Sequence, residues 1–333
     1  MNDQPGEAVL GVRPRGPLSR WVLEYLRGAP TTSRPPRPPA GCGFGDDLQL
    51  ALYLCYEGHF GPLLGVPADR EWTPTLVAFC ATLERAFEEA LRQSATAGPR
   101  VGPVRELLPR IVAADDGPSV SRRMETVGTM DEMREFVLHR SAYQLKEGDA
   151  HTFGIPRLHG RAKQLLVEIQ AGEYGADVAE RMMHAELFAQ TMRGLGLDDR
   201  PNAYLDALPG SALMVSNLIS LFGLHRRWRG ALVGHLAVFE MSSTIPMGRY
   251  SRGLERMGAS PSTRRFYDVH VLADAEHEKM ALEMADALSK DEPELVADIL
   301  FGARCVNVVE RLFAGELFRR WGLDGVASAR TSA

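Results

Sequence analysis

Three side chains of metal-ligand type share one face of a predicted helix towards the C-terminal end of the chain. In the segment FYDVHVLADAEH, the residues His270, Asp274 and His277 are spaced four and three positions apart. At about 100° per residue, this spacing places them within roughly 60° of one another. The stripe continues through the apolar Ala281, so it faces the interior, where a carboxylate needs a cation or hydrogen-bond donors. The triplet favours a metal site, and the alternative for each histidine alone is a satisfied core residue.

Three further stretches carry candidate ligands. Glu173 and His184 are eleven residues apart, close to three turns, which predicts that both project from the same side of a single helix. Glu240 is a lone acid at the end of an apolar helical run and needs a partner from elsewhere in the fold. Glu147 follows a predicted helix end, where an exposed acid is the alternative. Neighbouring glutamates are expected to be solvated surface acids: Glu168, Glu180 and Glu186.

Helices that direct Glu and His side chains inward build carboxylate-bridged dimetal sites. The predicted ligand set is Glu147, Glu173, His184, Glu240, His270, Asp274 and His277. Its four carboxylates balance the charge of two divalent ions, while the histidines stay neutral. Carboxylates and imidazoles without a thiolate indicate iron or manganese rather than structural zinc. The Glu-x-x-His signature of ferritin-type bundles is missing from the sequence.

The elements that must position these residues are predicted to be helices, because strand alternation is hardly visible in the chain. Asp131 is a plausible N-cap, Pro156 suits a first helical turn, and Gly194 and Gly196 suit a helix end. No βαβ spacing is present, so the sequence predicts an all-α bundle. The expected helical stretches are 19–26, from 46 onward, 76–91, from 131 onward, 211–224, 231–241, 262–288 and 293–321.

The amino-acid composition limits the classes of protein to which this chain can belong. The 333 residues are 45% hydrophobic and 24% charged, which predicts one large globular domain and excludes disorder for most of the chain. We expect a Pro/Arg-rich arm with one short helix over residues 1–41, a single domain over 42–325 and a flexible tail over 326–333. The net charge of −5 argues against a nucleic-acid-binding surface. Four cysteines without CxxC spacing imply neither a zinc site nor a disulfide framework.

The sequence predicts neither a signal peptide nor a membrane span. The first twenty residues contain three prolines and lack a continuous apolar stretch. The longest uncharged run, 207–225, contains Pro209, Gly210, Asn217 and three serines, which favours a buried helix. We therefore expect a cytoplasmic protein.

From about Asp46 onward, the chain resembles the haem-oxygenase-like diiron oxidases, also described as iron-containing redox enzymes. The likeness runs through DLQLALYLCYE, REFVLHRSAYQLKEGDAHTFGIPRL, EIQAGEYG, MHAELF, FEMSS and YDVHVLADAEH. The family's ligands on one core helix correspond to Glu173 and His184, and the segment between them is one residue longer than in the branch it most resembles. A π-bulge or a shifted turn would absorb that residue. The other family ligands correspond to Glu240, to His270, Asp274 and His277, and, for the extra glutamate of the N-oxygenating branch, to Glu147.

The resemblance implies a haem-oxygenase-like helical bundle without haem. It further implies a pair of Fe(II) ions, with manganese as an alternative at one site, and O2 as the co-substrate. The substrate would be a small amine- or carboxylate-bearing molecule, and N-oxygenation in specialised metabolism is the first expectation. Oxidative C–C cleavage or desaturation of an amino or fatty acid by the same site is one alternative. A non-catalytic metal-binding helical protein is an alternative of another class.

Expected partners follow from this picture. They are the small-molecule substrate, an external electron donor that such chemistry allows, and a second copy in a homodimer, because apolar helix faces are in surplus. We expect no nucleic acid, no membrane, and no catalytic residue beyond the metal ligands. The GxxxG pattern of Gly230 and Gly234 favours helix–helix packing over close approach to a flat cofactor. Three histidines without ligand spacing are expected to be structural or near the pocket: His139, His151 and His159.

Overall fold

The computed structural model of the protein describes residues 11–28, 34–61, 66–96, 98, 102–176 and 181–323, without the side chains of 272–275. Within these ranges the fold is helical and contains no strand, which confirms the predicted all-α class. The α-helices are α2 (Pro17–Leu26), α3 (Asp46–Glu57), α4 (Pro74–Ser94), α5 (Val104–Ala113), α6 (Val120–Thr126), α7 (Met130–Gln144), α8 (Asp149–Thr152), α9 (Gly160–Glu173), α10 (His184–Gly194), α11 (Gly210–Leu224), α12 (Arg229–Arg256), α13 (Pro261–Asp291) and α14 (Val296–Arg320).

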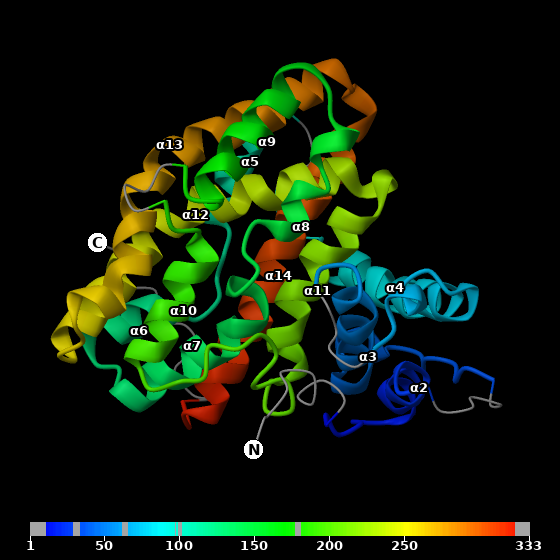
Figure 1. Cartoon of the computed structure of the whole chain (residues 1–333). Coiled ribbons are helices and arrows are strands. Elements are labelled where there is room, and N and C mark those ends of the chain that lie inside the picture. Colours follow the sequence, from blue (N-terminus) through cyan, green and yellow to red (C-terminus); the bar gives the residue numbers. More distant parts are fainter. Residues whose placement is uncertain are drawn as a thin grey trace.

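Three long C-terminal helices form the frame of the bundle. Helix α12 packs along both α13 and α14, while α9 and α10 pack against α13 (Figure 1). Helix α11 joins this frame to the N-terminal helices, because it packs against α14 on one side and α3 on the other. Helices α2, α3 and α4 lie together at one end of the molecule (Figure 1). The candidate ligands therefore come from the part of the fold built around α12 and α13.

Small residues allow α12 and α14 to approach closely. A Cβ atom added at Gly234 would overlap the backbone carbonyl of Ile299, and one added at Gly302 would overlap that of Ala231. A Cβ added at Gly230 would lie 3.1 Å from the Cβ of Asp298 on α14 and 3.2 Å from that of Leu295, which is closer than ordinary van der Waals contact. The predicted role of the GxxxG pattern in helix packing is confirmed, since the backbones of the two helices meet at these glycines.

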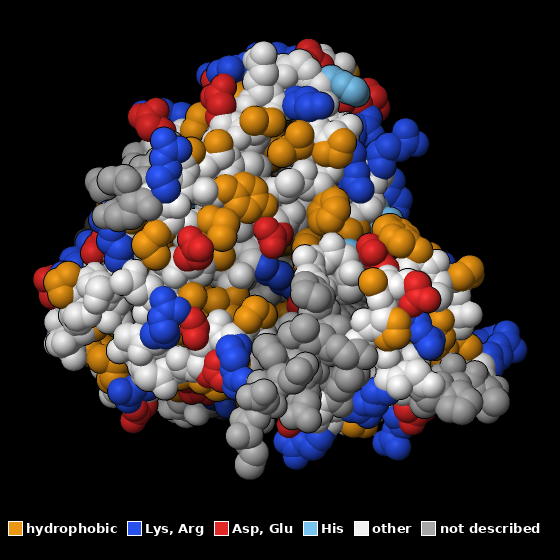
Figure 2. Space-filling view, in the orientation of Figure 1, with side chains coloured by type: hydrophobic (Ala, Val, Ile, Leu, Met, Phe, Trp, Pro, Cys, Tyr) orange, Lys and Arg blue, Asp and Glu red, His pale blue; other side chains and the backbone are white. Residues whose placement is uncertain are grey.

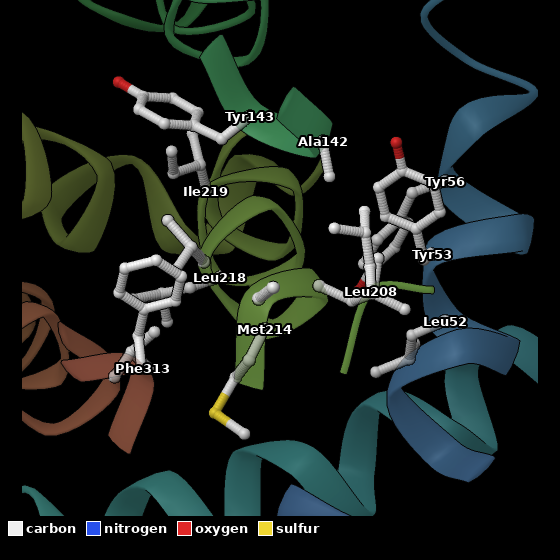
Figure 3. Close-up of a cluster of buried hydrophobic side chains, with 14 of the residues drawn as sticks. Leu52, Tyr53, Tyr56, Ala142, Tyr143, Leu208, Met214, Leu218, Ile219 and Phe313 are labelled. Atoms are coloured by element: carbon white, nitrogen blue, oxygen red, sulfur yellow. The ribbon is translucent and has the colours of Figure 1, made fainter. Parts of the chain in front are cut away.

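The larger part of the core surrounds α11. Figure 3 shows Met214, Leu218 and Ile219 of this helix between the tyrosines of α3 on one side and Phe313 of α14 on the other. The α11 sequence is apolar around most of its circumference, which is expected of a helix that is buried on all sides. This helix accounts for the uncharged run that the sequence assigned to a buried element.

Several predicted boundaries shift in the structure. The N-cap of α7 is Thr129, in a capping box with Glu132, so the prediction that Asp131 caps this helix is wrong. Pro156 lies in a short 3-10 turn, Ile155–Arg157, and α9 begins only at Gly160. The short helix predicted in the N-terminal arm is present as α2, and its apolar face is buried against α3. The predicted tail, 326–333, lies outside the described residues.

The surface is mixed in character. On the face shown in Figure 2, acidic and basic side chains are interspersed, and hydrophobic side chains gather towards the centre. Among the described residues, no helix has both the length and the apolar character that a membrane crossing would need.

The close contact between α12 and α14 predicts the effect of adding a single methyl group. We expect Gly234→Ala to lower the free energy of unfolding by at least about 2 kcal/mol, because the new Cβ has no space. Gly315→Ala is the matched control on α14, since nothing lies within 4 Å of its added Cβ. It should raise stability by roughly 0.5–1 kcal/mol through helix propensity. Urea unfolding of both variants checks this, and equal effects would contradict the packing.

Candidate metal centre

Glu173 and His184 approach each other from two helices, so the prediction that they share one helix is wrong. Helix α9 ends at Glu173 because Gly175 adopts φ +89°, and Gly175 N–H and Ala176 N–H close the end on the carbonyls of Gly172 and Ala171. The next helix begins at His184. The chain turns between them, which brings the Oε2 atom of Glu173 within 3.0 Å of His184 Nδ1.

The first donor group contains Glu147, Glu173, His184 and His270. Each offers one ligand atom, and these atoms all lie within 4.8 Å of one another. The Nε2 atom of His270 lies 3.7 Å from Glu147 Oε2, and the rings of His184 and His270 have centroids 4.2 Å apart. All four side chains are buried. This group could hold a metal ion.

The second donor group contains Glu173, Glu240 and His277, which are also buried and also offer ligand atoms within 4.8 Å of one another. His277 Nδ1 lies 3.6 Å from Glu240 Oε2 and 3.8 Å from Glu173 Oε1. Glu173 belongs to both groups: its Oε2 faces His184 and its Oε1 faces His277. A carboxylate with one oxygen towards each group is in the position of a bridge between two ions.

The donor separations fit metal ligation. Two atoms that each lie about 2.1 Å from a common ion, at angles of about 90–120°, are separated by roughly 3.0–3.6 Å. The pair His277–Glu240, at 3.6 Å, is at the upper end of this range, and the pair His270–Glu147, at 3.7 Å, is 0.1 Å above it; both are too long for a hydrogen bond. Carboxylate and imidazole donors without thiolate suit iron or manganese. The residues present therefore fit the pair of ions that the sequence predicted.

The charges of the site are compensated unequally. Burial raises the pKa of Glu173, but the neighbouring His184, His270 and His277 outweigh it and hold the pKa at about 2. Burial also raises the pKa of Glu240, the negative charge of Glu173 adds to that effect, and the neighbouring His277 opposes it. An added cation would favour the ionised form of both carboxylates.

His270 is held as a neutral ligand by its own helix. Its Nδ1–H donates to the backbone carbonyl of Phe266, 2.8 Å away, and a carbonyl can only accept, so the Nε2 atom carries the lone pair. Burial lowers the pKa of His270 to about 3, with a contribution from the nearby His184. The lone pair of Nε2 therefore faces Glu147, which belongs to the same donor group.

Glu147 is buried although it lies in a turn between α7 and α8. The neighbouring Lys146 pairs with the buried Glu57 of α3, and Glu57 also accepts a hydrogen bond of 2.9 Å from Asn202. Gly148 follows with φ +89°, and a Cβ there would lie 3.2 Å from the Cβ of Glu173. The turn is thus fixed on one side by an ion pair and on the other by close contact with α9.

Of the seven predicted site residues, the structure brings six together: Glu147, Glu173, His184, Glu240, His270 and His277. The side chain of Asp274 lies outside the described residues.

A cavity of about 250 Å³ opens beside the donor groups, and Glu147, Glu173, Glu240 and His270 form part of its wall. Six aromatic side chains also line it: Phe136, Tyr143, Phe239, Tyr250, Tyr267 and Phe313. Arg140 lines it too, but its charge is neutralised by a bidentate pair with Glu310 at 2.8 and 2.5 Å. Sequence reasoning did not identify these residues, although Tyr143 and Tyr267 each lie a few positions from a candidate ligand.

Three buried histidines lie outside the two donor groups: His139, His151 and His235. His151 lines the cavity, as predicted for a residue near the pocket, and its Nε2 lies 3.1 Å from Nδ1 of His235. Burial lowers the pKa of His139 and of His151 to about 4, with opposing effects of Glu135 and Glu173 respectively. Burial also places the pKa of His235 well below its usual value.

These depressed pKa values predict acid lability of the metal-free protein. Below about pH 6.5 the unfolded chain binds protons at these histidines, whereas the folded chain does not until about pH 4, so stability falls as the pH drops across this window. We expect His139→Phe to reduce the loss between pH 7 and 5 by about 1–2 kcal/mol. Urea unfolding at both pH values measures this, and an unchanged pH dependence would contradict it.

Comparison with known proteins agrees with this geometry. A family model described as an iron-containing redox enzyme matches residues 134–309, which is more than half of the chain and includes every candidate ligand. None of the curated proteins is significantly similar to the chain in sequence. With the helical fold and the buried cluster of Glu and His side chains, this match shows that the chain belongs to the haem-oxygenase-like family of iron-containing redox enzymes.

Proposed function

We propose that the protein is a non-haem diiron oxygenase that uses O2 to oxygenate the nitrogen of a small amine. The observation that carries this proposal is the position of Glu173, whose two oxygens face two separate groups of buried ligands. One group would be enough for a single stored or structural ion. A shared carboxylate between two groups is the arrangement expected of a bridged pair.

In this proposal each ion has its own set of ligands. Glu147, His184 and His270 would hold one ion, Glu240 and His277 would hold the other, and Glu173 would offer one carboxylate oxygen to each. Asp274, on the same predicted stripe as His270 and His277, is the candidate that the sequence adds to the second set. The four carboxylates then balance two divalent ions, so that the occupied centre is neutral and its burial costs less than that of the bare carboxylates.

Bound iron would supply the electron transfer to O2 that the protein's own side chains cannot perform. The chain contributes the positions of the ligands, a neutral imidazole at His270, and a cavity with six aromatic side chains in its wall, which limit water beside the centre. N-oxygenation of an amine adds one oxygen atom to nitrogen and converts the other to water, with two protons and two electrons from an external donor. Glu147, which resembles the extra ligand of N-oxygenating relatives, supports this reaction and lies among the first donor group.

The proposal predicts the number of ions that each variant binds. Anaerobic titration with Fe(II) should load about two ions per chain in the native protein. Glu240→Gln and Glu147→Gln should each lose one ion, while Glu173→Gln should lose both, because the bridge serves both groups. Glu168→Gln is the control, since this exposed acid lies on the same helix, α9. Equal stoichiometry in all of these variants would contradict the assignment.

Activity gives a second prediction. The Fe(II)-loaded protein, supplied with a reductant, should consume O2 with small primary amines and form products heavier by one oxygen atom. His277→Ala should lower this rate at least about 100-fold while the far-UV circular dichroism stays native. His159→Ala, an exposed histidine before α9, should leave the rate unchanged.

Two outcomes would contradict the proposal in whole or in part. Iron loading without O2 consumption on any amine or acid would favour a metal-binding protein without catalysis. If the protein cleaves or desaturates a fatty or amino acid and does not oxygenate amines, the assignment as a diiron oxidase is supported and the assignment of N-oxygenation is contradicted.

A further inference from the structure

Three polar side chains in the cavity wall are buried and hold an atom that has no hydrogen-bond partner among the described residues. They are Gln144, Gln170 and Tyr267, which are 5%, 2% and 1% exposed, and the atoms are Oε1 of each glutamine and the tyrosine hydroxyl. A buried polar atom without a partner costs about 1–3 kcal/mol. Three of them lining one cavity therefore indicate a ligand that completes their hydrogen bonds.

Their positions place them beside the proposed centre. Gln144 precedes Glu147 by three residues, Gln170 precedes Glu173 by three, and Tyr267 precedes His270 by three. Residues three apart on a helix lie on the same face, about one turn away from each other, which applies to Gln170 and Glu173 on α9 and to Tyr267 and His270 on α13. Gln144 ends α7, directly before the turn that carries Glu147, so the three polar groups come from three different segments around one cavity.

The orientation of Gln170 defines what it can bind. Its Nε2 donates to the carbonyl of Gly148 and to the hydroxyl of Thr152, both at 2.6 Å. A backbone carbonyl cannot donate, so the nitrogen of the amide must face Gly148 and Oε1 must face the other way. Oε1 of Gln170 can only accept a hydrogen bond. The unpartnered atom of Gln144 is likewise an amide oxygen, and only the hydroxyl of Tyr267 can both donate and accept.

We propose that Gln144, Gln170 and Tyr267 bind the amino group of a primary amine whose apolar body lies against the aromatic wall of the cavity. This inference rests on the proposed function, because it names the substrate class of the same site. A neutral primary amino group donates its two N–H bonds to the two amide oxygens, and its lone pair accepts a hydrogen bond from the hydroxyl of Tyr267. The nitrogen, which is the atom to be oxygenated, then lies beside the candidate ligands.

A carboxylate fits the same three atoms poorly. It carries acceptors only, so it would form one hydrogen bond with Tyr267 and direct lone pairs at the oxygens of both glutamines. Nearby cations do not change this, because Arg140 is already paired with Glu310 and Arg311 with Asp116. The cavity of about 250 Å³ is slightly below the usual size of ligand pockets, about 300–1,000 Å³, which limits the amine to a small molecule.

The experiment measures binding in the absence of turnover. The protein is loaded with Zn(II), which neutralises the carboxylates without redox chemistry, and titrated by calorimetry with 2-phenylethylamine and 3-phenylpropionate. We expect the amine to bind at least about tenfold more tightly than the carboxylate. Tyr267→Phe and Gln144→Met should each weaken the amine about five- to tenfold, the effect of about one lost hydrogen bond.

Stability separates a binding role from a structural one. Tyr267→Phe should leave the melting temperature unchanged or raise it, since its hydroxyl has no partner within the described part of the protein. Tyr53→Phe is the matched control: its hydroxyl donates to Asn202 at 2.7 Å, outside the cavity. This variant should lose stability and bind the amine as the native protein does.

Each result decides the inference. Equal affinity for amine and carboxylate would overturn it, as would Tyr267→Phe with unchanged amine affinity, in which case ordered water serves these atoms instead. Its failure is distinct from that of the proposed function. If the zinc-loaded protein binds the amine but the iron-loaded protein consumes no O2, the amine subsite is supported and the oxygenase function is contradicted. If the iron-loaded protein turns over acids with O2 but the zinc-loaded protein does not bind the amine, the oxidase function is supported and the amine subsite is contradicted.

Discussion

The carboxylate of Glu173, buried among His184, His270 and His277, is the interaction on which the rest of the site depends. It ends one helix, faces the first residue of the next, and reaches a third helix through His277. Glu147 and Glu240 lie around it, so three acids are removed from water within a few ångströms. Neutral histidines compensate such charges only in part, and divalent ions would do so fully. This uncompensated negative charge is the physical reason for proposing metal ions in the core of the bundle.

The scaffold explains how so many polar groups can be held in one place. Glycines let α12 and α14 pack with their backbones in contact, which fixes the helix that carries Glu240. The left-handed Gly175 ends α9 directly after Glu173 and turns the chain so that His184 faces it. On the opposite side, the pair of Lys146 and Glu57 ties the turn that carries Glu147 to α3. The cavity occupies the space that these elements enclose on one side of the ligands.

Much of this arrangement was predictable from the sequence, and the exceptions have physical causes. The i, i+7 spacing of His270 and His277 is fixed by helix geometry, so their shared face did not depend on other elements. The single helix through Glu173 and His184 was a wrong prediction, because residue spacing alone does not show that Gly175 adopts a left-handed conformation and that the helix ends at Glu173. Burial of Glu147 follows from contacts with α9 and α3, which the local sequence does not contain. Gln144, Gln170 and Tyr267 went unnoticed because a polar residue reveals its missing partner only once the fold surrounds it.

Diffraction from crystals of the Fe(II)-loaded protein, recorded at the iron absorption edge, tests the central claim most directly. The account predicts two anomalous peaks about 3.5–4 Å apart, one among Glu147, His184 and His270 and the other beside Glu240 and His277, with an oxygen of Glu173 bound to each. A single peak, or two peaks of which Glu173 contacts neither, would contradict the shared carboxylate and the paired centre with it.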